Sequence, residues 1–445
     1  MKTSLPIFVR NSMYALRGGF LVRPLLISLA LGLAGMILSS AEERFPVVSA
    51  WVPDALFPSH ADPQVAQVML STIASSIMTV VSIVFAILLM TLTLASMQFS
   101  PRILVNFVRD HVTQWTLGVF LGTFLYCMAA MPAARSLPQP FAPVATVTGA
   151  LALALASVMG LIYFIHHISR AVSVNHIVDR IARETERVID ELMPRKRGAV
   201  ARGEDMEFEP EETEFAVLNV RSGYICFIDT TRLLKLAKAH KLRIRVLRPI
   251  GHFAPEGAPL FTVSHKSRLT AELDRDFRSA FGIGPMRTMQ QDVEFGVLQI
   301  VDIALKAISP AVNDPSTAIN CIDQLTSILI RWAERAPPAT IFSDPPYVVR
   351  VILPWPDFKH LLDTAFEQIR HYSANDVAVS LRLLRAMDDL AATLNDDSMR
   401  KEVTLCGRRV VANCATRLDP TNLKRLEDRL ASLEARSPSF ATRGA

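Results

Sequence analysis

The residues whose types could carry chemistry lie in two short polar segments of the C-terminal half. Asp292, Asn313 and Asp314 supply two carboxylates and an amide that could form a small polar site. The simpler interpretation is structural: Asp314 caps a helix that begins at Pro315, and Asp292 makes polar contacts between two helices. The chain contains no glycine-rich phosphate loop, HExxH, GxSxG or metal-ligand spacing. We therefore expect a protein that is not an enzyme and has no catalytic residues, cofactor or bound metal.

A second polar pattern follows an apolar segment near the N-terminus. Four hydroxyl residues recur there at three- and four-residue steps, which places them on one face of a helix: Thr72, Ser75, Thr79 and Ser82. One hypothesis is that this face lines a pore in an oligomer. The alternative is that small residues let helices pack closely while the hydroxyls bond to carbonyls of their own helix. The packing rule favours the second interpretation of the stripe.

These hydroxyls belong to the second of four apolar segments. A bilayer core about 30 Å thick is crossed by about 20 helical residues. The spans are predicted at 20–41, within 64–99, at 112–131 and at 144–165. The second segment has no Asp, Glu, Lys or Arg between Asp62 and Arg102. It ends near Gln98, after which Ser100 is predicted to cap the next helix and Arg102 to lie at the lipid surface.

The distribution of charge predicts how the spans are oriented. The short flanks on one side carry more Lys and Arg than those on the other, where residues 42–62 include Glu42, Glu43 and Asp54. By the positive-inside rule, both termini are predicted to be cytoplasmic. The net charge of +5 includes no long basic tract. We therefore expect membrane lipid and further copies of this chain as partners, and no nucleic acid.

Composition divides the chain into four parts. We predict an α-helical membrane domain with four transmembrane helices at 1–168, a membrane-exit helix and linker at 169–213, a small β-rich module at 214–266 and a mainly helical region at 267–445. The last two parts form a cytoplasmic α+β domain. In the module, strands at 215–220 and 224–228 are predicted to flank a turn at Ser222-Gly223. Residues 248–260 are similar to the turn of a small β-sandwich of the biotinyl/lipoyl type, without the lysine in an exposed hairpin that would mark lipoylation.

Three segments carry a family resemblance. They are Gln98-Phe99-Ser100-Pro101-Arg102, Arg287-Thr288-x-x-Gln291-Asp292-x-x-Phe295-Gly296 and Ser309-Pro310-Ala311-Val312-Asn313-Asp314-Pro315-x-Thr317-Ala318. With them, nearly the whole chain resembles the bacterial predicted membrane proteins of domain-of-unknown-function family twenty-two fifty-four. The resemblance implies the four-span topology and a bacterial inner (plasma) membrane location, and it implies no activity. The polar residues of these segments join the hydroxyl stripe as candidate functional residues: Gln98, Ser100, Arg102, Arg287, Gln291, Asp292, Asn313 and Asp314.

Two functional hypotheses follow. The first is an oligomeric channel-like or transport-related protein with a cytoplasmic regulatory domain. It accounts for the hydroxyl stripe and for spans without an ionised residue at depth, which ion-coupled carriers usually have. The second is a membrane-anchored cytoplasmic scaffold or sensor without transport activity. Since four spans are more than an anchor needs, we favour the first hypothesis. The sequence names no permeant ion or small-molecule ligand.

Overall fold

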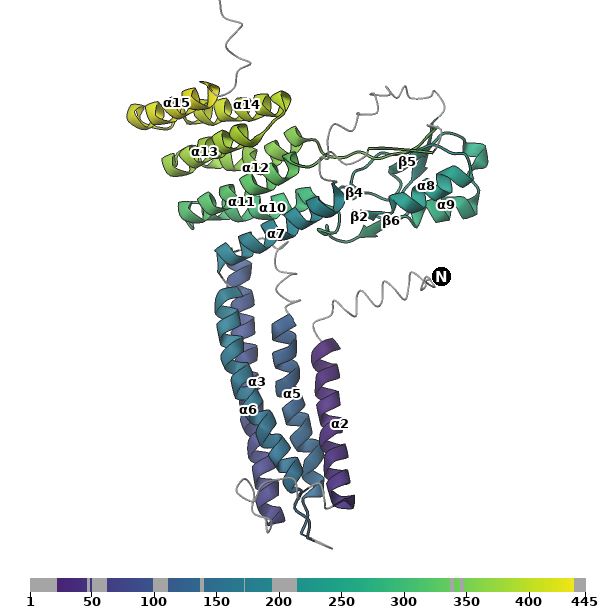
Figure 1. Cartoon of the computed structure of the whole chain (residues 1–445), viewed down its shortest axis with the longest axis vertical. Helices are drawn as coiled ribbons and strands as arrows, with labels where there is room; N and C mark the ends of the chain where they lie inside the picture. The colour runs from purple at the N-terminus through teal and green to yellow at the C-terminus, as the bar shows by residue number, and fades with distance from the viewer. Residues whose placement is uncertain are drawn as a thin grey trace, which may run out of the picture. The chain divides into compact units, whose positions relative to one another are not determined.

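The computed structural model describes residues 22–45, 49, 62–98, 111–136, 140–171, 173–193, 214–336, 340–344 and 348–435. These residues form two compact units, Met1–Ser173 and Val174–Ala445. Figure 1 labels the helices and strands of both units.

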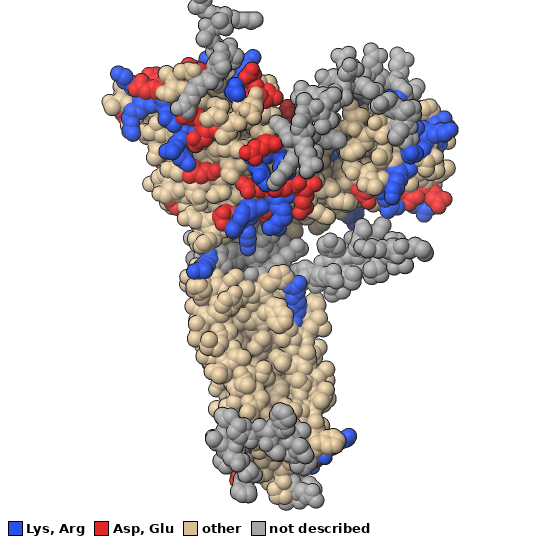
Figure 2. All heavy atoms as spheres, in the orientation of Figure 1, with Lys and Arg blue, Asp and Glu red and all other residues tan. Residues whose placement is uncertain are grey.

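The described part of the N-terminal unit contains four helices that are long and apolar enough to cross a membrane. They are α2 (Val22–Arg44), α3 (Pro63–Gln98), α5 (His111–Ala130) and α6 (Val144–Ala171), with a short 3-10 helix, η2 (Met131–Ala133), after α5. The four predicted spans are confirmed as helices. Figure 2 shows Lys, Arg, Asp and Glu concentrated on the C-terminal unit, while the visible surface of the four helices carries few of them.

Helices α2 and α5 pack with their backbones close together. A Cβ atom added at Gly122 of α5 would lie 2.4 Å from Leu31 Cδ1, and one added at Gly35 of α2 would lie 2.7 Å from the Tyr126 carbonyl oxygen. Lipid tails are as apolar as the helices, so close packing of small residues is what holds such helices together. Gly118 and Gly122 provide the four-residue spacing of small residues that this packing uses.

The C-terminal unit begins with α7 (Val174–Leu192), a helix separate from α6. Within the segment predicted as a membrane-exit helix and linker (169–213), α6 ends at Ala171 and α7 begins at Val174. Helix α7 packs on α11 through Arg331, whose Nη2 lies 2.6 Å from Asp190 Oδ2. The hydrogen bond from Arg331, with a smaller contribution from Arg335, holds the Asp190 pKa below its ordinary value.

The strands of this unit form two sheets. The strands and their associated helices are β1 (Phe215–Leu218), β2 (Gly223–Ile228), α8 (Thr230–Ala239), β3 (Ile244–Val246), β4 (Phe253–Ala254), β5 (Pro259–Val263), η3 (Lys266–Arg268), α9 (Ala271–Arg278), β6 (Phe281–Gly284), β7 (Ile341–Asp344) and β8 (Val348–Ile352). One sheet is five-stranded and mixed, in the order β1-β5-β3-β8-β7, and the other has the order β4-β2-β6. A shared apolar core that includes Phe261 and Phe277 lies beneath them.

Two sequence predictions for this region need correction. Strands β1 and β2 do not pair across the turn at Ser222-Gly223, since β1 pairs with β5 and β2 pairs with β4 and β6. The predicted small β-sandwich is also too local, because β3 pairs in parallel with β8, about a hundred residues later. The part of the prediction that is confirmed is a C-terminal region that combines β-strands with helices; its larger sheet is mixed.

The remaining helices form the other lobe of the C-terminal unit (Figure 1). They are α10 (Val293–Ala307), α11 (Pro315–Ala333), α12 (Phe358–Tyr372), α13 (Val377–Thr393), α14 (Asp397–Cys414) and α15 (Pro420–Ala435). Side-chain carboxylates cap α10 to α14 at their first turns, with Asp292 and Asp314 serving α10 and α11. Asp caps satisfy backbone N–H groups that have no partner within the helix.

Candidate functional site

Arg287 forms a buried ion cluster with two carboxylates between β6 and α10. Its Nε and Nη2 donate to Asp292 Oδ2 and Oδ1, both at 2.8 Å, and Nη2 also donates to Glu294 Oε2 at 2.8 Å. The Asp292 side chain is only 3% exposed. Asp292 Oδ1 also accepts from the Phe295 backbone N–H at 3.0 Å, which is the cap of α10. One carboxylate therefore caps the helix and neutralises the arginine.

The cluster is covered on one side by a glycine turn. Gly251 has φ +85°, and a Cβ atom there would lie 2.3 Å from Asp292 Oδ2 and 2.5 Å from Arg287 Nη2. Its N–H donates to the Ile225 carbonyl of β2 at 2.8 Å. Only glycine combines this conformation with so close an approach.

Gln291 ties the start of α10 to the end of β2. Its Oε1 accepts from the Ile228 N–H at 3.0 Å, and its Nε2 donates to the Ile228 carbonyl at 3.5 Å. Arg287, Gln291 and Asp292 thus meet at one junction, where the sheet lobe joins the helical lobe. We define Arg287, Gln291, Asp292, Glu294 and Gly251 as the junction cluster.

The cluster extends to α12 through a histidine. Glu294 Oε1 lies 2.6 Å from His360 Nε2. Burial raises the Glu294 pKa, but Arg287 and His360 outweigh it, so the pKa lies below its ordinary value. A depressed carboxylate pKa stabilises the fold above the unfolded-state pKa, and this contribution is lost as pH falls through the folded-state pKa.

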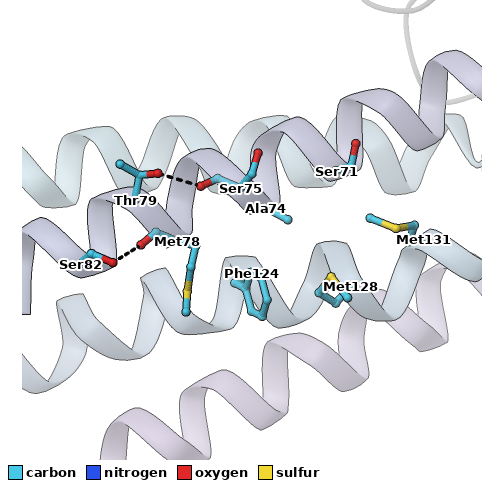
Figure 3. Close-up of a pocket in the computed structure, with 9 residues that line it drawn as sticks. All are labelled: Ser71, Ala74, Ser75, Met78, Thr79, Ser82, Phe124, Met128 and Met131. Carbon is cyan, nitrogen blue, oxygen red and sulfur yellow. Dashed lines mark hydrogen bonds between the residues drawn. The ribbon is translucent and has the colours of Figure 1, made fainter.

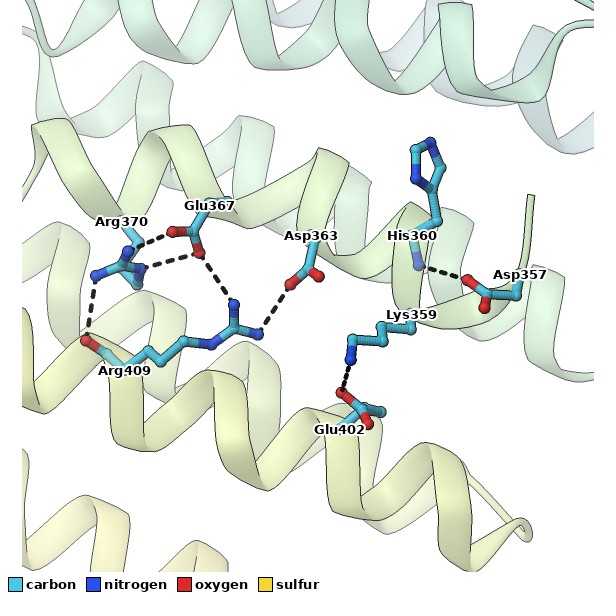
Figure 4. A network of polar contacts seen from close by, with 8 residues as sticks. All are labelled: Asp357, Lys359, His360, Asp363, Glu367, Arg370, Glu402 and Arg409. Atoms are coloured by element: carbon cyan, nitrogen blue, oxygen red, sulfur yellow. Dashed lines mark hydrogen bonds and ion pairs between the residues drawn. The ribbon is translucent and has the colours of Figure 1, made fainter.

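Beyond His360, ion pairs join α12 to α14 (Figure 4). Arg409 Nη2 lies 2.8 Å from Asp363 Oδ1, and its Nη1 lies 3.3 Å from Glu367 Oε2. Arg370 also pairs with Glu367. The hydrogen bond from Arg370 is the main reason that the Glu367 pKa lies below its ordinary value. Most of these side chains are partly exposed, so each pair contributes little to stability.

Asn313 and Asp314 do not join the junction cluster. Asp292 precedes α10, whereas Asn313 and Asp314 follow its end, which places them roughly 20 Å apart along a fifteen-residue helix. Asp292 therefore does not share one polar site with Asn313 and Asp314. Asn313 instead adopts φ +48° in the turn between α10 and α11.

The hydroxyl stripe of α3 lies on an exposed side of the helix, facing away from the core of the four-helix unit. Each hydroxyl donates to a carbonyl of the preceding turn: Thr72 to Val68 at 2.7 Å, Ser75 to Thr72 at 3.1 Å, Thr79 to Ser75 at 3.1 Å and Ser82 to Met78 at 3.0 Å. The predicted hydrogen bonding within the helix is confirmed. Among the described residues, the four stripe side chains are exposed, so the close packing predicted with it is not seen.

Three of these hydroxyl residues line an open groove of about 560 Å³ between α3 and α5. Figure 3 shows Ser75, Thr79 and Ser82 on α3, with Phe124 and Met128 across the groove on α5. The α5 wall is therefore apolar, and the α3 wall combines hydroxyl residues with Ala74 and Met78. Gln98 is the last residue of α3, and its side chain, like Ser100 and Arg102, lies outside the described residues.

Comparison with known proteins identifies a matching family. Residues 17–389 match the family model described as predicted membrane protein (DUF2254). The chain belongs to this family. Uncharacterised proteins of Mycobacterium bovis and Mycobacterium tuberculosis are each 32% identical over 395 residues, covering 87% of this chain and 74% of theirs. No solved structure matches the chain.

The match to the DUF2254 family extends over both the hydroxyl stripe and the junction cluster. The family's description names no reaction. Among the described residues, no three His, Cys, Asp or Glu side chains gather as a metal site would require. The charged groups of the junction cluster pair with one another and with His360, and its other hydrogen bonds are to the backbone. Its geometry suits a structural joint.

Sequence reasoning missed one buried carboxylate of the N-terminal unit. Glu42, at the end of α2, accepts from the Ala145 N–H at 2.8 Å, the Thr146 N–H at 3.0 Å and the Thr146 hydroxyl at 2.9 Å. It thereby caps α6, where the helix dipole favours an anion. The available signal was an acidic residue next to a span, but nothing in the sequence pairs it with a helix a hundred residues later.

The cap at Asp314 gives a measurable stability prediction. Its Oδ1 accepts from the Thr317 N–H at 3.1 Å, and its Oδ2 accepts from the Thr317 hydroxyl at 2.6 Å. Asp314→Ala is expected to lower the free energy of unfolding by about 1 kcal/mol, because two first-turn donors lose their acceptor. Asp314→Asn, which can still cap, serves as the control. Unchanged melting of Asp314→Ala together with altered function would contradict a purely structural role.

Proposed function

We propose that this protein is a homo-oligomeric, channel-like protein of the bacterial inner membrane, with both termini and the C-terminal unit in the cytoplasm. The observation that carries the proposal is the exposed hydroxyl stripe of α3. In a monomer this face would meet lipid, where polar groups are unfavourable. In an oligomer, the same face of each copy could point toward a shared symmetry axis. The hydroxyl groups would then form the polar wall of a pore on that axis.

The charges of the spans support passive conduction. Among the described residues of α2, α3, α5 and α6, Asp, Glu, Lys and Arg occur only near the helix ends. Ion-coupled carriers usually hold an ionisable residue at membrane depth. A hydroxyl-lined path without such a residue fits a conduit better than a coupled carrier.

In this proposal the C-terminal unit regulates conduction without catalysing a reaction. Its junction cluster fixes the sheet lobe against the helical lobe. A conformational change caused by a ligand on one lobe would therefore be transmitted to the other lobe. The charged side chains of the cluster are engaged with one another and with His360, which supports a non-enzymatic role.

One observation favours the scaffold or sensor alternative. Because every hydroxyl of the stripe already donates to its own helix, α3 can face lipid at a reduced cost. A monomeric anchor would then suffice.

The oligomeric state separates the two functions. Full-length protein in lipid nanodiscs, weighed by native mass spectrometry, is expected to be a trimer or a larger ring. The variant Ser75→Leu/Ser82→Leu should shift it toward smaller species, whereas Ala152→Leu, at an exposed position of α6, should not. A stable wild-type monomer would refute a pore on a symmetry axis and leave the scaffold alternative.

A further inference from the structure

A second groove, between α5 and α6, combines an apolar floor with an aromatic rim. It measures about 360 Å³, and Val119, Phe120, Ala156 and Gly160 contribute to its lining. Trp115 and Tyr163 also line it and are 59% and 57% exposed. Trp and Tyr are enriched where a membrane protein crosses from hydrocarbon to headgroups. The groove therefore lies where an acyl chain meets its headgroup.

Basic side chains gather at one end of this groove. His111, the first residue of α5, lines the groove, and its Nε2 lies 3.4 Å from Nη1 of Arg23 on α2. His167, one turn beyond Tyr163, stacks on the Tyr163 ring with centroids 6.3 Å apart. Arginine binds phosphate oxygens well because its guanidinium presents several donors in one plane.

Gly160 keeps the groove open. A Cβ atom added there would meet a single atom, Phe120 Cε1, at 3.6 Å, an ordinary contact distance. Glycine at this position is therefore not required by helix packing, in contrast to Gly122, where a Cβ atom would lie 2.4 Å from Leu31. Its absent side chain leaves the space that forms the groove.

We propose that the α5–α6 groove binds one acyl chain of an anionic phospholipid, whose phosphate lies on Arg23 and His111. The occupant is a lipid because the groove is apolar, opens on the outer surface of membrane-spanning helices and ends at basic donors. The preference is for an anionic headgroup because Arg23 lies at the phosphate end. The site is separate from the α3 groove, so it does not depend on conduction.

Trp115 reports occupancy directly. The full-length protein is reconstituted in mixed vesicles in which either phosphatidylglycerol or phosphatidylcholine carries brominated acyl chains, which quench nearby tryptophan. The Trp115 signal is the difference between wild type and Trp115→Phe. Quenching should favour phosphatidylglycerol about fivefold, as expected for one basic side chain beside anionic lipid.

Two variants test the two ends of the site. Arg23→Gln should abolish the preference for phosphatidylglycerol, while Arg44→Gln, at the other end of α2, should retain it. Gly160→Leu should fill the groove and reduce quenching by both lipids, while Ala152→Leu, exposed on α6 and outside the groove, should not. Equal quenching by the two lipids in wild type, or an unchanged preference in Arg23→Gln, would overturn the proposal even if Gly160→Leu failed to fold.

Discussion

Replacing Arg287 with methionine is expected to lower the free energy of unfolding of the C-terminal unit by about 3–5 kcal/mol. The substitution leaves the carboxylate of Asp292 buried without its counter-charge, and Glu294 loses its 2.8 Å partner. For a unit of this size, the loss corresponds to a melting temperature lower by about 10 °C. Fluorescence of Trp332 and Trp355 in the full-length protein reports the transition, since both lie in the C-terminal unit.

Two controls identify the buried charge as the cause. Arg183→Met removes an exposed pair with Asp179 on α7 and should cost less than about 0.5 kcal/mol. Adding Asp292→Asn to Arg287→Met should recover much of the loss, because asparagine can still cap α10 and carries no charge. If Arg287→Met were no more destabilising than Arg183→Met, the junction cluster would not hold the two lobes together.

Making the α3 stripe apolar is expected to reduce ion conductance by at least about tenfold. Ser82→Leu replaces a hydroxyl with a larger apolar side chain, and a barrier higher by about 1.4 kcal/mol lowers a rate about tenfold. Apolar constrictions also exclude water from a pore. The measurement is the KCl conductance of planar bilayers that contain the reconstituted full-length protein.

Ala152→Leu is the control, because it adds a leucine at an exposed position of α6, away from the stripe. Its conductance should equal that of wild type. Suppose instead that wild-type protein conducts and that Ser75, Thr79 and Ser82 can all be made apolar without effect. The stripe would then not line the path.

Features set by short stretches of sequence were predictable. The four spans follow from length and hydropathy, because a helix must satisfy its own backbone in lipid. The start of α11 was also predictable, because Asp314 supplies the cap and Pro315 a fixed φ. In both cases the interactions lie within one helical segment.

Features that join distant segments were not predictable. The pattern at 215–228 resembles a hairpin, but β1 is held by β5 and β2 by β6. Local spacing cannot reveal such pairing, because strands with similar alternation can exchange partners at little local cost. The polar residues were found, but not the fact that Gly251 closes over Arg287 and Asp292, since that contact spans some forty residues.

The most direct test of the proposed pore is whether the α3 stripe contacts water. A Ser82→Cys variant in a Cys226→Ser background is treated in reconstituted vesicles with a charged, membrane-impermeant methanethiosulfonate. The other native cysteines, Cys127, Cys321, Cys406 and Cys414, are buried. Val158→Cys, on an exposed position of α6, is the lipid-facing control. Thiols react as thiolates, which form in water and not in hydrocarbon. The proposal predicts rapid labelling of Ser82→Cys and little labelling of Val158→Cys; equally slow labelling of both would contradict it.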